Sequence, residues 1–196
     1  MPATAVTTAQ HRFTWADYCS WTDGQQWEII HGIPYCMSPA PTIRHQNVTG
    51  ALFARIEQQL RGHPCRPFVA PTDVKLSESD VVQPDILVVC DPNKITETHI
   101  EGAPDLIVEV LSPGTAARDL RQKKALYEGS CVREYLVVDP LEHYAICFLL
   151  IDGVFDAGTV FSHDEILTLT TLDAVAVPLW EVFGLAGPAA ATTANR

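Results

Sequence analysis

Apolar residues gather in two short runs near the middle of the chain, and each run begins at a Pro-Asp pair. The first run spans 85–90 and the second spans 105–111, and both are rich in Ile, Leu and Val. Short runs of this kind, bounded by turn-forming residues, predict buried β-strands. Because side chains alternate along a strand, Asp85 shares a face with Leu87, and Glu109 shares a face with Ile107. Each strand therefore carries an acid on an apolar face.

A helix is predicted after the second strand, over 116–128, because Thr115 is a suitable N-cap and the helix then meets a glycine. Asp119, Lys123 and Tyr127 follow one another at four-residue spacing, which places them on one face of such a helix. Buried carboxylates are costly unless a cation or hydrogen-bond donors pair with them. Two buried acids followed by a lysine are therefore typical of a metal or catalytic site.

Two acids follow prolines, and only one of them suits a site shared with Glu109. Asp105 lies four residues from Glu109 on the same strand, which separates them by roughly 13 Å. One metal ion cannot bridge that distance. Asp85 belongs to a different strand, and a neighbouring strand lies about 4.8 Å away. The predicted pair is therefore Asp85 with Glu109, and Asp105 is expected only to begin its strand.

Further strands and helices are predicted on both sides of this centre. They are a helix over 15–22, a hairpin over 27–37, a helix over 42–61, strands over 66–70, 73–77 and 133–139, a hairpin over 143–161, weaker strands over 166–172 and 174–177, and a helix over 179–183. The chain has 196 residues, of which 47% are hydrophobic, which fits one α/β domain. We expect a flexible leader over 1–12, the domain over 13–185 and a disordered tail over 186–196.

The charge of the chain is strongly asymmetric. Its net charge is -11, which disfavours nonspecific nucleic-acid binding over most of the surface. Four of the 13 basic residues nevertheless lie within the predicted central helix, at Arg118, Arg121, Lys123 and Lys124. DNA would therefore have to meet this helix, and Arg118, Arg121 and Lys124 are the predicted DNA-binding residues.

The cysteines and the N-terminal residues indicate in which cellular compartment the protein is expected. None of the six cysteines forms a C-x-x-C pair, so reduced thiols in a cytoplasmic protein are expected rather than disulfides or a zinc site. Residues 1–12 lack the apolar core of a signal peptide. The longest apolar run, over 145–151, is too short to cross a membrane, so no membrane partner is expected. The histidines show no H-E-x-x-H pattern, which argues against a zinc hydrolase.

Six motifs occur in a fixed order along nearly the whole chain. They lie at 27–32, at 37–41 with His45, at 83–85, at 103–113, at 119–127 and at 133–140. In this order they resemble the Uma-two family of restriction endonucleases, which belongs to the PD-(D/E)xK nuclease superfamily. The resemblance implies a restriction-endonuclease-like α/β fold, in which helices flank a mixed β-sheet core with additional β-hairpins.

The resemblance also implies a divalent-metal site for Mg²⁺ or Mn²⁺. Its ligands would be the carboxylates of Asp85 and Glu109 and the backbone carbonyl of Val110. The lysine of the superfamily motif would fall at Leu111, which is a departure from the pattern. In similar nucleases that lysine has moved to the following helix, where Lys123 stands.

The chemistry of phosphodiester hydrolysis assigns roles to these residues. It needs an activated water and stabilisation of the negative charge that develops, and a cation held by carboxylates supplies both. Lys123 would assist the water, and Glu28 would be a further acid of the site. Three residues are expected in secondary roles: His45 as a hydrogen-bond donor near a helix start, Asp119 as an ion-pair partner of Lys123, and Tyr127 in packing.

Several readings stay open. The first is a metal-dependent DNA endonuclease, and the second is a nonenzymatic binding or assembly module that keeps the same fold. The net charge favours the module, whereas the retained acids and lysine favour the enzyme. Hydrolysis of a small phosphoester, or a structural ion-pair network without chemistry, are further alternatives. A homodimer is also predicted, because the C-terminal hairpins expose more apolar surface than a sheet edge should, at Phe148, Leu149, Leu150, Phe155 and Phe161.

Overall fold

A large mixed sheet runs through the middle of the molecule. The computed structural model describes residues 11–37, 40–173 and 175–188, so most of the predicted leader and tail lie outside the described residues. The strands of the large sheet are β3 (Arg66–Val69), β6 (Ile86–Val89), β8 (Leu106–Val110), β9 (Glu134–Asp139), β10 (Tyr144–Ile151), β11 (Val154–Phe155) and β12 (Thr159–Ser162). Their order is β11-β10-β9-β8-β6-β3, and β12 also pairs with β10. Only the pairing of β8 with β9 is parallel within this sheet.

Two smaller sheets complete the β structure. The first has the order β2-β1-β5-β4-β7. Its strands are β1 (Trp27–Ile30), β2 (Ile33–Cys36), β4 (Val74–Ser77), β5 (Asp80–Val82) and β7 (Ile100–Glu101). The second consists of β13 (Ile166–Leu169) and β14 (Val175–Pro178). The hairpin predicted over 27–37 is confirmed, and it turns at His31 and Gly32, both with positive φ angles.

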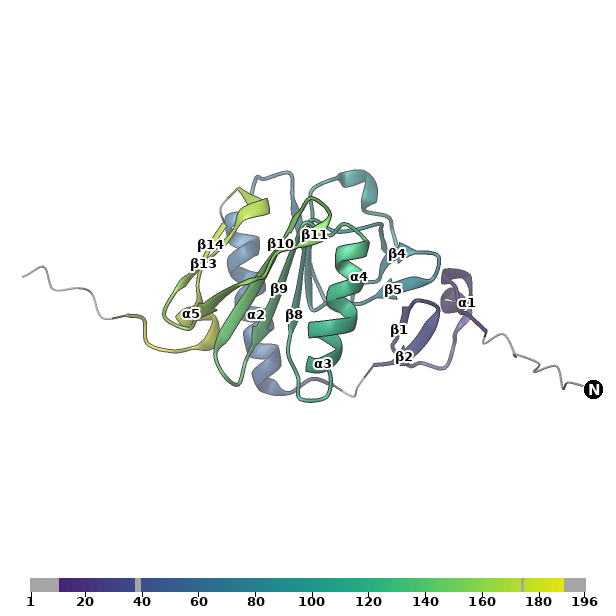
Figure 1. Ribbon diagram of the computed structural model, residues 1–196, viewed down its shortest axis with the longest axis horizontal. Coiled ribbons are helices and arrows are strands. Elements are labelled where there is room, and N and C mark those ends of the chain that lie inside the picture. Colours follow the sequence, from purple (N-terminus) through teal and green to yellow (C-terminus); the bar gives the residue numbers. More distant parts are fainter. Residues whose placement is uncertain (1–10, 38–39, 174, 189–196) are drawn as a thin grey trace, which may run out of the picture.

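Helices cover both faces of the large sheet. The helices and helical turns of the described residues are α1 (Trp15–Ser20), α2 (Ile43–Gln59), η1 (Pro92–Lys94), α3 (Ala116–Arg118), η2 (Asp119–Lys123), α4 (Lys124–Gly129), η3 (Thr170–Leu172) and α5 (Leu179–Phe183). Helix α2 lies on one side of the sheet, and the continuous segment α3–η2–α4 lies on the other (Figure 1). The β1–β2 hairpin and α1 lie beyond α4, whereas α5 and β13–β14 lie at the opposite end (Figure 1).

The alternation of side chains explains this layering. Ile86 and Val88 of β6 belong to the core cluster under α2, whereas Leu87 and Val89 belong to the cluster that contains α4. All four residues are fully buried, so β6 has no solvent-facing side. By the same alternation, Glu109 of β8 lies on the α4 side of the sheet. The predicted α/β class, with helices flanking a mixed sheet, is confirmed.

The helix predicted over 116–128 differs from the expectation in one turn. Residues Asp119–Lys123 form a π turn, and Thr115 makes no side-chain capping hydrogen bond. The backbone N–H of Lys124 donates to the carbonyl of Asp119, and the hydroxyl of Tyr135 donates to the same carbonyl at 3.1 Å. A hydrogen bond from a neighbouring strand therefore supports the irregular turn. Single π turns inside α-helices are frequent at functional sites.

The prediction that all cysteines are reduced thiols is wrong for one pair. Cys65 and Cys90 form a disulfide, whereas Cys19, Cys36, Cys131 and Cys147 are free. The antiparallel pairing of β3 with β6 brings the two residues opposite each other, next to the Arg66–Val89 pair. Sequence spacing alone could not reveal this neighbourhood, because it depends on the pairing of two strands.

The C-terminal strands bury part of the surface that was expected at a dimer interface. Phe148 and Phe155 are each only 6% exposed and pack in the core cluster on the α4 side. The large exposed apolar residues of this region are Ile151, Val154 and Val160 instead. The prediction that Phe148 and Phe155 lie at a dimer interface is therefore wrong, because both are buried in the core.

Within the described part of the chain, no helix is long and apolar enough to cross a membrane.

Candidate active site

A cleft of about 420 Å³ contains most of the predicted site residues. It lies where the start of α2, the β1–β2 hairpin and the α3–η2 segment meet at one end of β6 and β8. Four acids and three basic side chains line it: Glu28, Asp85, Glu109 and Asp119, together with His45, Arg118 and Lys123. The cleft therefore combines a surplus of carboxylates with basic groups from two different helices.

The two acids of the central strands approach each other through strand pairing. Strands β6 and β8 are antiparallel, and Ile86 lies opposite Val108. One step further along the ladder, Asp85 faces Glu109. The Oδ2 atom of Asp85 accepts a hydrogen bond from the backbone N–H of Val110 at 2.8 Å. Asp85 is thereby fixed to the strand that carries Glu109.

Lys123 is the centre of an ion-pair network. Its Nζ lies 2.8 Å from Oε1 of Glu28, 2.9 Å from Oε1 of Glu109 and 3.9 Å from Oδ1 of Asp119. Burial alone would lower the pKa of Lys123, but the three carboxylates outweigh burial and raise its pKa. The side chain is therefore an ammonium at neutral pH, although the residue is only 4% exposed.

Glu109 receives two donors on one oxygen. Besides Lys123, the hydroxyl of Tyr127 donates to Oε1 of Glu109 at 2.7 Å. Burial raises the pKa of Glu109 well above its ordinary value, and the nearby ammonium opposes this shift. Burial also raises the pKa of Tyr127, so the phenol keeps its proton and remains a donor. Tyr127 thus holds the carboxylate and is more than the packing residue that was expected.

His45 joins the site from the other side of the sheet. It is only 8% exposed, and its Nε2 lies 3.2 Å from Oδ2 of Asp85. Its Nδ1 lies 3.4 Å from the hydroxyl of Thr49. Burial lowers the pKa of His45, but the hydrogen bond and charge of Asp85, with a hydrogen bond to the backbone of Val110, outweigh burial and raise it. His45 is therefore a partner of Asp85 and not merely a donor at a helix start.

Glu28 is fixed by a network that sequence reasoning missed. Its Oε1 accepts the backbone N–H of Gln83 at 3.1 Å. The side-chain amide of Gln83 donates to the hydroxyl of Tyr18 and to Asp73, and Tyr18 donates to Asp73 as well. Gln83 was part of the motif at 83–85, but its long-range partners are not visible in the sequence. Glu28 is only 2% exposed, so it is a buried member of the site and not a surface residue of its strand.

The three basic residues predicted to bind DNA take different positions. Arg118 lines the cleft. Arg121 is exposed on the helix. The Nζ of Lys124 lies 3.9 Å from the ring centroid of Phe148, which directs the amine towards β10. The structure therefore brings only Arg118 together with the acids.

The donors in the cleft include carboxylate and carbonyl oxygens, which are the ligands that a hard divalent cation prefers. In the part of the chain that the structure describes, the side-chain contacts of Asp85 fall on Oδ2 and those of Glu109 fall on Oε1, so Oδ1 and Oε2 are the oxygens that an ion would use. Among the described residues, no three His, Cys, Asp or Glu side chains are arranged to hold one ion. Two carboxylates and a carbonyl nevertheless fit Mg²⁺, which usually keeps several waters and takes one or two protein carboxylates.

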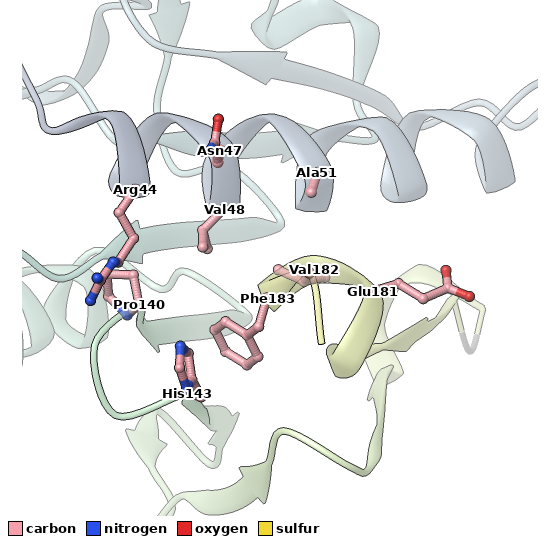
Figure 2. A pocket seen from close by; sticks show the side chains of 10 residues that line it. Arg44, Asn47, Val48, Ala51, Pro140, His143, Glu181, Val182 and Phe183 are labelled. Atoms are coloured by element: carbon pink, nitrogen blue, oxygen red, sulfur yellow. The ribbon is translucent and has the colours of Figure 1, made fainter. Parts of the chain in front are cut away.

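A second pocket, of about 450 Å³, lies between α2 and α5 and contains none of the predicted site residues. Arg44 and Val48 project into it from α2, and His143 and Phe183 close it from the opposite side (Figure 2). Glu181 at its rim is already paired with Arg55 at 2.6 Å. This pocket therefore holds none of the acids or the lysine of the candidate site.

Comparisons with known proteins agree with this architecture. Residues 15–179 match the family Uma2, described as "putative restriction endonuclease". The chain is 30% identical over 128 residues to an uncharacterized protein of Synechocystis sp., and the alignment covers 62% of this chain and 66% of that protein, just under two thirds. A solved structure described as a putative nuclease of the group DUF820, from Anabaena variabilis, has a similar fold. Its TM-score is 0.73 at 16% identity, and the similarity covers 88% of this chain and 98% of that one. Because the family match spans most of the sequence, the chain belongs to the Uma2 family.

Proposed function

We propose that the protein is a metal-dependent nuclease that hydrolyses DNA phosphodiester bonds in the cleft around Lys123. The observation that carries this proposal is the convergence of Glu28, Glu109 and Lys123 on one buried ion-pair network, with Asp85 lining the same cleft. Perturbed pKa values and buried charges in a cleft are typical of functional sites. Membership of the Uma2 family supports the same reaction class.

The metal would be held by Asp85, Glu109 and the carbonyl of Val110. A Mg²⁺ or Mn²⁺ ion held there would supply a nucleophilic water at neutral pH and would stabilise negative charge on the phosphate. His45 holds Oδ2 of Asp85, and Tyr127 holds Oε1 of Glu109, so the second oxygen of each carboxylate would serve as the metal ligand. These contacts preorganise the two acids before any substrate binds.

Lys123 acts as the fixed positive charge of the site. Its ammonium is held by Glu28 and Glu109 in a position that lines the cleft. A buried ammonium near a scissile phosphate stabilises the negative charge that develops during hydrolysis, because little solvent screens it. Lysine is not a metal ligand, so its role is electrostatic. Glu28 in turn keeps Lys123 charged.

A second candidate function is a nonenzymatic binding or assembly module. Two observations favour it: His45 and Lys123 already neutralise the acids, and the net charge of -11 opposes DNA binding. In that case the network would serve only to hold α2, β6, β8 and η2 together. Hydrolysis of a small phosphoester would need the same residues but not a DNA-binding surface.

The discriminating experiment combines metal binding with cleavage. Purified protein is assayed on supercoiled plasmid and on single-stranded DNA with Mg²⁺, Mn²⁺ or Ca²⁺ at low ionic strength, and metal binding is measured by calorimetry. We expect cleavage with Mg²⁺ or Mn²⁺, binding without turnover with Ca²⁺, and loss of both metal binding and cleavage in Asp85→Asn. A chromogenic phosphodiester assayed in parallel tests the small-substrate alternative.

Asp105→Asn is the matched control, because it changes the other Pro-Asp aspartate. Asp105 accepts the backbone N–H of Cys90 and pairs with Arg133, outside the cleft. It should retain metal binding and cleavage. Intact DNA in every metal, together with no heat of metal binding to the wild type, would favour the nonenzymatic module instead.

A further inference from the structure

The cleft contains one basic group that is not neutralised by its acids. Lys123 pairs with Glu28 and Glu109, and His45 pairs with Asp85. Arg118 lines the same cleft, and among the described residues it forms no ion pair. A cation placed beside four carboxylates would be expected to turn towards one of them. The contact that Arg118 makes instead therefore bears on the ligand that it binds.

Arg118 is stacked on an aromatic ring instead. Its Cζ lies 4.6 Å from the centroid of the Tyr35 ring, on β2. The ring itself is held from the helix, because Nε2 of Gln122 donates to the hydroxyl of Tyr35 at 2.9 Å. Gln122 precedes Lys123 in the π turn η2. The hairpin that carries Glu28 and the turn that carries Lys123 are thus joined at this stack.

A guanidinium that stacks on an aromatic ring keeps its N–H groups free to donate hydrogen bonds. The Cζ atom of Arg118 lies over the Tyr35 ring, and the N–H groups of a guanidinium lie in its own plane, so a contact through its flat face does not use them. Such a fork matches two oxygens of a phosphate and binds them with two parallel hydrogen bonds. Lysine lacks both the flat face and the fork. A stacked arginine beside an acidic centre is therefore suited to bind the anionic phosphate of a substrate.

We propose that Arg118 binds the phosphate group of the nucleic-acid backbone in the cleft, and that Tyr35 is the residue that positions Arg118. This inference rests on the proposed nuclease function and makes it more specific. It separates Arg118 from Arg121 and Lys124, which were predicted together: the first contacts the reacting region, and the other two lie outside the cleft. It also adds Tyr35 as a positioning residue that no motif indicated.

The test measures affinity separately from cleavage. Binding of a fluorescently labelled single-stranded oligonucleotide is followed by anisotropy, in Ca²⁺ and again in EDTA, at low ionic strength. We expect Arg118→Ala to weaken binding about 10-fold or more, since a charge-assisted hydrogen bond is lost. Arg121→Ala and Lys124→Ala should each weaken it less. Arg61→Ala, which removes an exposed charge at the far end of α2, is the control for net charge.

Tyr35 is tested through a conservative pair of variants. Tyr35→Leu should weaken binding about threefold, because the stacking surface is lost. Tyr35→Phe keeps the ring and should restore most of that affinity. In cleavage assays with Mn²⁺, Tyr35→Leu should raise KM with little change in kcat, whereas a merely structural role would change the melting temperature and leave KM unaffected.

The outcomes separate this inference from the proposed function. Equal losses in Arg118→Ala and Arg61→Ala, or wild-type binding by Tyr35→Leu, would overturn the inference while leaving a nuclease intact. A wild-type protein that neither retains the oligonucleotide nor cleaves DNA would overturn both. Cleavage by the wild type together with a KM that is unchanged in Arg118→Ala would also reject the phosphate-binding role.

Discussion

The Nζ of Lys123 lies 2.9 Å from Oε1 of Glu109, although the two residues belong to a helical turn and a strand that are 14 positions apart in the chain. Both side chains are almost completely buried. Neither can exchange its partner for water, so each sets the electrostatic environment of the other. This dependence makes the pair the most sensitive point of the candidate site.

Removing Lys123 should therefore destabilise the fold as well as abolish activity. In Lys123→Met, the carboxylates of Glu28 and Glu109 would remain buried without their cation, at a cost of about 3–5 kcal/mol of unfolding free energy. Urea unfolding in EDTA measures this loss. Lys124→Met is the matched control, because it removes the neighbouring lysine, whose contact with Phe148 is worth about 1 kcal/mol. Equal stability of the two variants would contradict the network.

Glu134 should hold the C-terminal strands against the large sheet. It is fully buried, and its carboxylate accepts the backbone N–H groups of Thr170 and Thr171 and the hydroxyl of Thr171. Glu134→Ala would leave these donors unpaired and should cost about 3 kcal/mol. Amide hydrogen exchange should accelerate at residues 170–171. Glu142→Ala, at an exposed acid of the same region, should change the stability by no more than about 0.5 kcal/mol.

The Cys65–Cys90 disulfide should stabilise the protein without contributing to the cleft. The cross-link closes a loop with a sequence separation of 25, for which a contribution of about 3 kcal/mol is expected. Cys65→Ala should therefore unfold at lower urea concentration, and a reducing agent should shift the wild type but not the variant. Cys19→Ser changes an exposed free thiol and should leave the transition in place. A wild type that does not respond to reduction would argue against the cross-link.

The large elements could be predicted from the sequence because their signals are local. The runs at 85–90 and 105–111 are strands, and the turn at His31-Gly32 closes a hairpin. The pairing of Asp85 with Glu109 followed from alternation and strand spacing, although Asp85 lies immediately before β6 and not within it. The disulfide could not be foreseen, because it depends on which strands pair.

The finer features of the site depend on contacts between distant residues. Tyr127 could be placed on the face of Lys123, but not on the carboxylate of Glu109, since that contact depends on how the helix packs on β8. Glu28 is fixed by the backbone of Gln83, 55 positions away. The Tyr35–Arg118 stack joins a hairpin to a helix. Such contacts leave no periodic signal in one sequence.

The predicted homodimer can be tested at the edge of the large sheet. Val160 of β12 is 62% exposed, and Val154 of β11 is 59% exposed. Exposed edge strands with apolar side chains favour pairing with a second copy. We expect light scattering to give the mass of a dimer at micromolar concentration, and Val160→Lys to give a monomer. A monomeric wild type would reject the dimer, whereas a dimeric Val160→Lys would place the interface elsewhere.

The π turn of η2 allows the segment to hold one extra residue without turning the following helix away from the site. A π turn holds one residue more than an α turn, so deletion of the exposed Arg121 would allow the segment to close as a regular helix. Each residue of an α-helix advances the direction of its side chain by about 100°. After the deletion Asp119 and Tyr127 would be seven residues apart, or about 700° around a regular helix, so their side chains would still lie on one side of it. A one-residue gap at this place in a relative is therefore compatible with a carboxylate on β8 that keeps its partners, provided that the acids, the lysine and the tyrosine are still present.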